Sequence, residues 1–181
     1  MSLSEQFLDA GDIHPIDIVE SLATHYDWDF DRVADDQIAM AIEGQWRTYS
    51  VTLAWSSYDE TLRMICTFEM DPPEEGKAKL FETLNLVNDR CWAGAFTWWA
   101  AQKLMVYRYG LVLAGEQLAS PGQIACIVET AGLSAERYYP AFQPALWADP
   151  NPEEAMTVSF NHLQPPTYHL WVILVVAGIL Q

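Results

Sequence analysis

The stretch from Cys66 to Gly115 constrains the fold of this chain more than any other part of the sequence. It predicts a strand that ends at Met70, a helix of about five turns after the Asp71-Pro72-Pro73 break, and an aromatic-rich hairpin after Gly94. Apolar residues at helical spacing form the expected core-facing stripe: Leu80, Leu84, Val87 and Cys91. The stretch therefore fixes an α+β architecture, although it contains no recognisable set of reacting groups.

The N-terminal half predicts one helix followed by a run of strands. We expect His14 to cap this helix and Pro15 to occupy its first position, where proline is favoured. Apolar and polar residues then alternate with a period of two, which is typical of strands with one buried face. The alternating segments are 28–33, 38–42, 49–55 and 62–70.

The C-terminal half predicts a hairpin and a long helix. The hairpin strands are 96–101 and 104–113, and the motif Ser120-Pro121-x-Gln123 is a typical beginning of a helix. We expect Pro140 and Pro144 to end or bend that helix. Short connections imply antiparallel neighbours. The predicted fold is therefore an antiparallel sheet with helices packed on one face, in the order α-β-β-β(-β)-α-β-β-α.

Charge and composition exclude several classes of protein. A chain of 181 residues, half of them hydrophobic, is large enough for one buried core. Twenty-five acidic and nine basic side chains give a net charge of −16, which repels nucleic acids and anionic lipids. Three widely spaced cysteines do not form a disulfide framework, and the N-terminus lacks a secretory pattern. We therefore expect a cytoplasmic protein that binds no nucleic acid.

The candidate catalytic and metal-binding groups are weak. Asp27 to Asp31 resembles the opening of a calcium loop, but Arg32 and Ile38 stand where that loop needs Gly and Glu. These acids fit the exposed side of an edge strand better. The four histidines lack zinc-ligand spacing, and nothing fixes a geometry for Glu153-Glu154 and His162. We expect no catalytic residues, no cofactor and no metal.

The aromatic residues are better candidates for a contact site. Trp98 and Trp99 are consecutive in a predicted strand, so they point to opposite faces and one helical layer cannot cover both. Trp46 is out of phase with Tyr49 in the same way. One indole must therefore be exposed, covered by another segment such as the chain's own tail, or covered by a partner chain. The predicted partner or dimer interface consists of Trp46, Leu84, Val87, Trp98, Trp99 and Trp171.

Six segments together carry a resemblance to a known family. They are HPIDIVE at 14–20, WDFDR at 28–32, FEM at 68–70, LNLVNDRCWAG at 84–94, VYRY at 106–109 and YYPAFQ at 138–143. In this combination the chain resembles the YbjN family of bacterial proteins, which are labelled sensory transduction regulators. That family is similar in fold to type III secretion chaperones, small acidic proteins that dimerise and hold partner segments. The resemblance implies no catalytic residues.

The C-terminal end departs from this resemblance. We expect a lead-in at 1–13, a YbjN-like α+β domain at 14–156 and an atypical extension at 157–181, in which the run from Leu170 to Leu180 is almost wholly apolar. This run is far short of the roughly 20 residues that span a bilayer. We therefore expect it to be buried as a strand or an arm, against this subunit or a second copy, and not inserted in a membrane.

Two functional hypotheses follow from the sequence. The first is a non-enzymatic, chaperone-like regulatory protein that forms a homodimer and holds a protein partner. The second is a small-molecule sensor or an unrecognised enzyme with a site between helices and sheet. A deep pocket with converging polar groups would favour the second hypothesis, and a flat surface rimmed by aromatic residues would favour the first.

Overall fold

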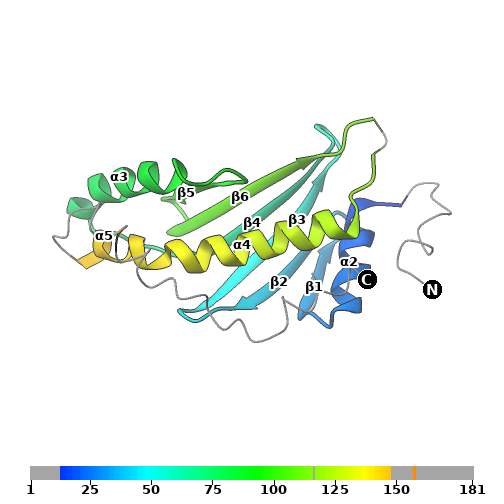
Figure 1. Cartoon of the computed structure of the whole chain (residues 1–181), viewed down its shortest axis with the longest axis horizontal. Helices are drawn as coiled ribbons and strands as arrows, with labels where there is room; N and C mark the ends of the chain where they lie inside the picture. The colour runs from blue at the N-terminus through cyan, green and yellow to red at the C-terminus, as the bar shows by residue number, and fades with distance from the viewer. Residues whose placement is uncertain (1–12, 116, 148–156, 158–181) are drawn as a thin grey trace.

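The computed structural model describes residues 13–115, 117–147 and 157 (Figure 1). Its helices are α2 (Pro15–His25), α3 (Lys77–Asn88), α4 (Pro121–Phe142) and α5 (Pro144–Trp147), with a 3-10 turn η1 (Glu74–Gly76) before α3. Its strands are β1 (Phe30–Ala34), β2 (Gln37–Glu43), β3 (Thr48–Ser56), β4 (Thr61–Glu69), β5 (Ala95–Trp99) and β6 (Leu104–Val112). The predicted α+β class is confirmed.

The strands form one six-stranded sheet in the order β1-β2-β3-β4-β6-β5, and every neighbouring pair is antiparallel. The meander from β1 to β4 follows the predicted period-two pattern. Alternate residues of β3 and β4 are fully buried, such as Val51 and Leu53 on β3 and Met64 and Cys66 on β4. The acidic segment around Asp31 lies on β1, an edge strand, as the sequence indicated.

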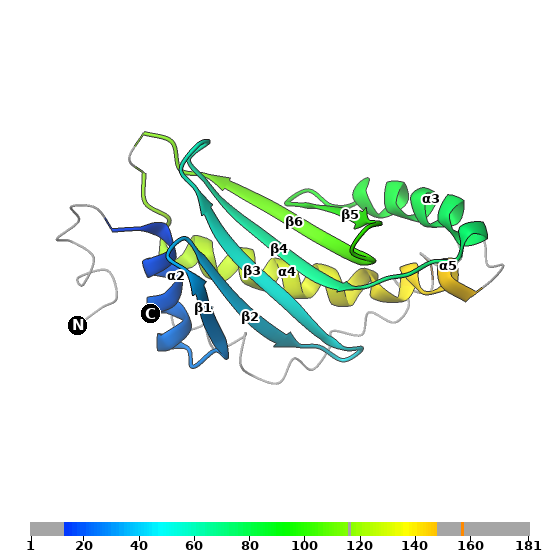
Figure 2. The same ribbon diagram turned by 180° about the vertical axis from the view of Figure 1, so that it is seen from behind.

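The long helices cover one face of the sheet. Figure 1 shows α4 crossing in front of the strands, with α2 at one end and α3 beside β5 at the other. Figure 2 shows the opposite face, where no helix lies in front of β2, β3, β4 or β6. The core lies between the sheet and α4, and includes Ile124, Ala131 and Phe142 of that helix. This one-sided layering is the predicted arrangement.

The predicted caps of the first and the last long helix are confirmed. His14 accepts a hydrogen bond from the backbone N–H of Ile16 through Nδ1 at 3.2 Å, with Pro15 in the first helical position. Ser120 and Gln123 form a capping box, in which each side chain accepts from the other residue's backbone N–H, at 3.1 and 2.9 Å. These bonds satisfy backbone donors that a helix start leaves unpaired.

The predicted end of the helix after Asp71-Pro72-Pro73 is wrong, whereas the long helix ends just before Pro144, as predicted. Helix α3 has 12 residues, not five turns, and ends at Asn88, six residues before Gly94. The side-chain amide of Asn88 accepts from the N–H of Phe96 at 2.7 Å and donates to its carbonyl at 3.0 Å, so it replaces a strand partner at the start of β5. Helix α4 continues through Pro140 to Phe142.

No helix within the described ranges is long and apolar enough to cross a membrane. The sequence also predicts a short helix that begins at Asn151. That segment and the apolar run from Leu170 to Leu180 lie outside the described residues.

Candidate contact site

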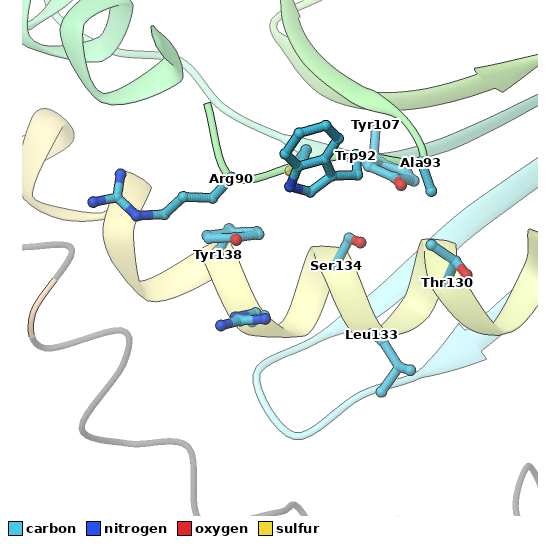
Figure 3. A pocket seen from close by; sticks show the side chains of 10 residues that line it. Arg90, Trp92, Ala93, Tyr107, Thr130, Leu133, Ser134 and Tyr138 are labelled. Atoms are coloured by element: carbon cyan, nitrogen blue, oxygen red, sulfur yellow. The ribbon is translucent and has the colours of Figure 1, made fainter. Parts of the chain in front are cut away.

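A shallow groove of about 220 Å³ lies between α4 and the segment 89–94, which joins α3 to β5 (Figure 3). Helix α4 contributes Thr130, Leu133, Ser134, Arg137 and Tyr138 to its lining. The connecting segment contributes Arg90, Cys91, Trp92 and Ala93, and β6 contributes Tyr107. The groove therefore joins three parts of the chain that are far apart in the sequence.

The local sequence holds the connecting segment close to the sheet. The connecting segment begins with turn-type hydrogen bonds from the N–H groups of Arg90 and Cys91 to the last carbonyls of α3. Gly94 then passes over β6 so closely that a Cβ there would lie 2.5 Å from the hydroxyl oxygen of Tyr107. Only glycine fits this approach. The intervening Trp92 is pushed outward and is 98% exposed at the rim of the groove.

The groove carries positive charge at its border and neutral groups inside. The guanidinium of Arg90 donates to the carbonyl of Leu86 at 2.8 Å, and that of Arg137 lies 5.5 Å from the ring centre of Tyr138. Burial raises the pKa of the Cys91 thiol, and burial likewise raises the pKa of Tyr138. The thiol is therefore held as a weak nucleophile.

The groove is small, and its chemistry is limited to the side chains that line it. In the part of the chain that the structure describes, no group of three or more His, Cys, Asp or Glu side chains could hold a metal ion. The volume is below the roughly 300–1,000 Å³ of pockets that enclose a small ligand. An exposed indole beside an apolar and hydroxyl-bearing hollow instead fits an inserted side chain of another polypeptide.

A second cluster lies on the other side of α4, around the carboxylate of Glu136, which is 7% exposed. Glu136 accepts from the hydroxyl of Tyr49 at 2.6 Å, from the N–H of Gln45 at 2.9 Å and from the N–H of Trp46 at 3.4 Å. A Cβ at Gly44 would lie 2.1 Å from the Glu136 Oε1 atom. The cluster therefore fastens the turn between β2 and β3 to α4, and we name it the Glu136 latch.

Burial dominates the chemistry of the latch. It raises the pKa of Tyr49 far above the ordinary value for tyrosine, and the hydrogen bond to Glu136 adds to the effect. The Tyr49 hydroxyl thus remains a donor at any ordinary pH. Because three donors surround one buried carboxylate, the latch satisfies its polar groups and has a structural purpose.

The structure separates the predicted interface residues. Trp46 and Trp99 reach the surface, with 45% and 36% exposure. Trp98 is partly buried in its own chain, where its indole N–H donates to the Met70 carbonyl at 2.9 Å. Leu84 and Val87 pack into the core of this chain, because their stripe on α3 faces inward. Trp171 lies outside the described residues.

Sequence reasoning missed the two most informative side chains. The sequence predicts a helix of about five turns after Pro73, but α3 ends at Asn88 and leaves the indole of Trp92 exposed. Glu136 gave no signal, because its partners lie about 90 residues earlier in the chain. The close-packed glycines 44 and 94 were the available clue, since each marks a place where another group approaches the backbone.

The fold is that of a small α+β protein with helices on one face of an antiparallel sheet, and the groove lies between α4 and the segment 89–94. A family model, YbjN, described as "Putative bacterial sensory transduction regulator", matches residues 15–144. This match covers most of the chain, so the protein belongs to the YbjN family, and the family resemblance seen in the sequence is confirmed.

A solved structure supports the same fold. The chain is similar to the crystal structure of YbjN from E. coli, described as a putative transcription regulator. The two share 11% sequence identity with a TM-score of 0.53, and the match covers 74% of this chain and 94% of that chain. At this identity the likeness shows the fold alone. No curated protein matches the chain.

Proposed function

We propose that this protein is a non-enzymatic cytoplasmic regulator that acts as a homodimer and binds a protein partner through the groove beside Trp92. The observation that carries the proposal is the 98% exposure of Trp92 at the rim of an open hollow. Large exposed aromatic side chains beside such hollows are typical anchors of protein interfaces. The description of the YbjN family model, "Putative bacterial sensory transduction regulator", supports the same direction.

Charge favours a protein partner over a nucleic acid. The net charge of −16 repels a phosphate backbone, and only nine basic residues are available to oppose it. Two of those nine, Arg90 and Arg137, border the groove. A partner segment that inserts an apolar side chain beside Trp92, flanked by an acidic residue, would match this border.

The competing hypothesis of a small-molecule sensor is less well supported. The polar groups inside the groove are hydroxyls and a thiol, among them Ser134, Tyr107 and Cys91, and its two charged side chains, Arg90 and Arg137, lie at the border. The groove is also open to solvent along its rim, where Trp92 is 98% exposed. A partner side chain fits this surface better than an enclosed metabolite does.

The test compares the substitution of Trp92 with the substitution of an equally exposed control residue, Tyr58. Tagged full-length protein is used for affinity capture from cells that express it natively, together with the variants Trp92→Ala and Tyr58→Ala. Tyr58 is 97% exposed, on the loop between β3 and β4, and is therefore a surface control of equal exposure. We expect Trp92→Ala alone to lose a captured protein. Equal capture by all three proteins, or micromolar and salt-sensitive binding to generic duplex DNA, would contradict the proposal.

A further inference from the structure

Strand β6 has two neighbours over only part of its length. Strand β4 pairs with all nine of its residues, from Leu104 to Val112. Strand β5 pairs only with the five residues from Leu104 to Arg108. Figures 1 and 2 show β5 beside one end of β6. The segment from Tyr109 to Val112 therefore forms an edge of the sheet, although β6 is not the last strand.

Backbone alternation identifies the groups on this edge. Leu113 donates its N–H to Glu60 at 2.8 Å, and the carbonyl of Lys103 accepts from Met70 at 2.8 Å, so both residues point toward the β4 side. In an antiparallel sheet, successive residues of one strand bond to opposite neighbours. Gly110 and Val112 therefore point away from β4, and none of the described residues pairs with their backbone groups on that side.

The 109–112 edge is less protected than the edge formed by β1, an outer strand of the sheet. On β1, Arg32 forms ion pairs with Asp17 and Glu20 at 2.6 and 2.5 Å, and such charges discourage further strand pairing. The edge at 109–112 reads Tyr-Gly-Leu-Val, with no charge and no proline, and Val112 is 62% exposed. An unprotected edge of this kind is a template for another strand.

We propose that a second copy of this chain pairs with the 109–112 edge, so that two β6 strands meet antiparallel with Leu111 opposite its own counterpart. In this register Gly110 lies opposite the partner's Val112, and Val112 lies opposite the partner's Gly110. Every backbone group that points to the open side then has a partner, and Arg108 keeps its pairing with Ala95. The inference rests on the homodimer in the proposed function and names its interface.

Side chains and charge also fit a second copy. Gly110 has no side chain, so the branched Val112 of the partner subunit can lie against it without a clash. No acidic residue occurs from Tyr109 to Gly115, so two copies that each carry a net charge of −16 would meet at a neutral strip. In the same register the partner chain leaves the shared sheet beside Tyr109, close to Tyr107 in the groove lining.

A matched pair of lysine substitutions tests this interface. Val112→Lys places a charge on the proposed edge, whereas Val33→Lys makes the same change on β1, where Val33 is 56% exposed. We expect the unmodified chain and Val33→Lys to be dimers in analytical ultracentrifugation, and Val112→Lys to dissociate with a Kd at least about tenfold higher. Circular dichroism checks that both variants fold.

The outcomes separate the interface from the dimer itself. A dimer unaffected by Val112→Lys contradicts the 109–112 interface and leaves the homodimer standing. A monomeric unmodified chain at high micromolar concentration contradicts both.

Cysteine substitution tests the register independently of charge. Leu111→Cys places two thiols opposite each other across the proposed two-fold axis, so mild oxidation should give a covalent dimer on a non-reducing gel. Leu104→Cys is the control on the same strand, inside the region that β5 already covers. Equal cross-linking of the two variants, or none for Leu111→Cys in a sample shown to be dimeric, would overturn the proposed register.

Discussion

One tryptophan reaches the surface on each side of α4, but the contacts around the two side chains differ. On the latch side, Trp46 donates its backbone N–H to Glu136, and its ring stacks on Tyr139 with ring centres 6.5 Å apart. On the groove side, no aromatic ring of the described residues lies against Trp92, which is 98% exposed. The same residue type thus belongs to the folded framework in one place and to a free surface in the other.

Because of this difference, substitutions on the two sides of α4 can separate effects on folding stability from effects on partner binding. The latch satisfies buried polar groups, so changes there should alter the free energy of unfolding. The groove buries little of Trp92, so changes there should alter binding and leave folding intact. Four predictions, ordered by the expected loss of stability, test whether the two sides can be separated in this way.

The largest effect is expected for Glu136→Ala. This change leaves the Tyr49 hydroxyl and the backbone N–H of Gln45 without their acceptor in a buried site, so we expect a loss of about 3 kcal/mol in urea unfolding. Glu129→Ala on the same helix is the control and should cost less than about 0.5 kcal/mol. Equal losses for both variants would mean that the latch contributes nothing specific.

A smaller effect, with a pH signature, is expected for Tyr49→Phe. Loss of the hydroxyl bond to Glu136 should cost about 1–1.5 kcal/mol at neutral pH. Burial raises the pKa of Tyr49, so above pH ~10 only the unfolded chain loses this proton, and stability falls by up to about 1.4 kcal/mol per pH unit. The phenylalanine variant lacks this contribution, and its alkaline slope should therefore be shallower.

The measurement is urea unfolding from pH 8 to pH 11. Part of the alkaline loss must persist in Tyr49→Phe, because burial raises the pKa of the Cys66 thiol to about 12 and adds a loss of the same sign above pH ~9. Tyr58→Phe, at an exposed position, is the control. Identical slopes for Tyr49→Phe and the unmodified chain would show that Tyr49 is not buried as described.

A still smaller effect is expected for Trp46→Ala. The substitution removes the stacking on Tyr139 but keeps the backbone N–H bond to Glu136, so we expect a loss of about 1 kcal/mol. Trp46→Phe should recover part of this loss, because a smaller ring still contacts Tyr139. Thermal unfolding of both variants checks the prediction, and a loss above about 3 kcal/mol would mean that the indole itself is a main part of the latch.

The smallest effect on stability is expected for Trp92→Ala. The indole is nearly fully exposed, so its removal should change the free energy of unfolding by less than about 0.5 kcal/mol. The same variant should lose partner capture. A loss of stability above about 2 kcal/mol, with capture unchanged, would reverse the contrast between the two sides of α4.

The sequence allowed much of the fold to be predicted, because the relevant signals are local. The caps at His14 and Ser120 involve neighbours within three residues, and the strands follow a two-residue period. The end of α3 could not be predicted, because the Asn88 amide bonds to Phe96 across a loop instead of to its own helix. The apolar stripe of the sequence continues to Cys91, past Asn88, where the helix ends.

The candidate site was harder to predict, because exposure depends on distant neighbours. Trp46 and Trp99 were correctly suspected of reaching the surface, since their phase in the strands opposes the core-facing residues. Leu84 and Val87 share a helix face that could meet either the sheet or a second chain, and only the three-dimensional packing places them in this chain's core. Which surface a partner covers is a property of the pair and not of this chain alone.

The Glu136 latch also has a consequence for the order of folding. Its hydrogen bonds join residues 91, 90 and 87 positions apart, whereas the meander from β1 to β4 forms between neighbours in the sequence. Contacts of such long range close late, because the intervening chain must first be ordered. We therefore expect the Glu136 carboxylate to remain hydrated until α4 packs against the completed sheet. Removing it should therefore speed unfolding by roughly a hundredfold, as a loss of about 3 kcal/mol requires when the refolding rate is almost unchanged.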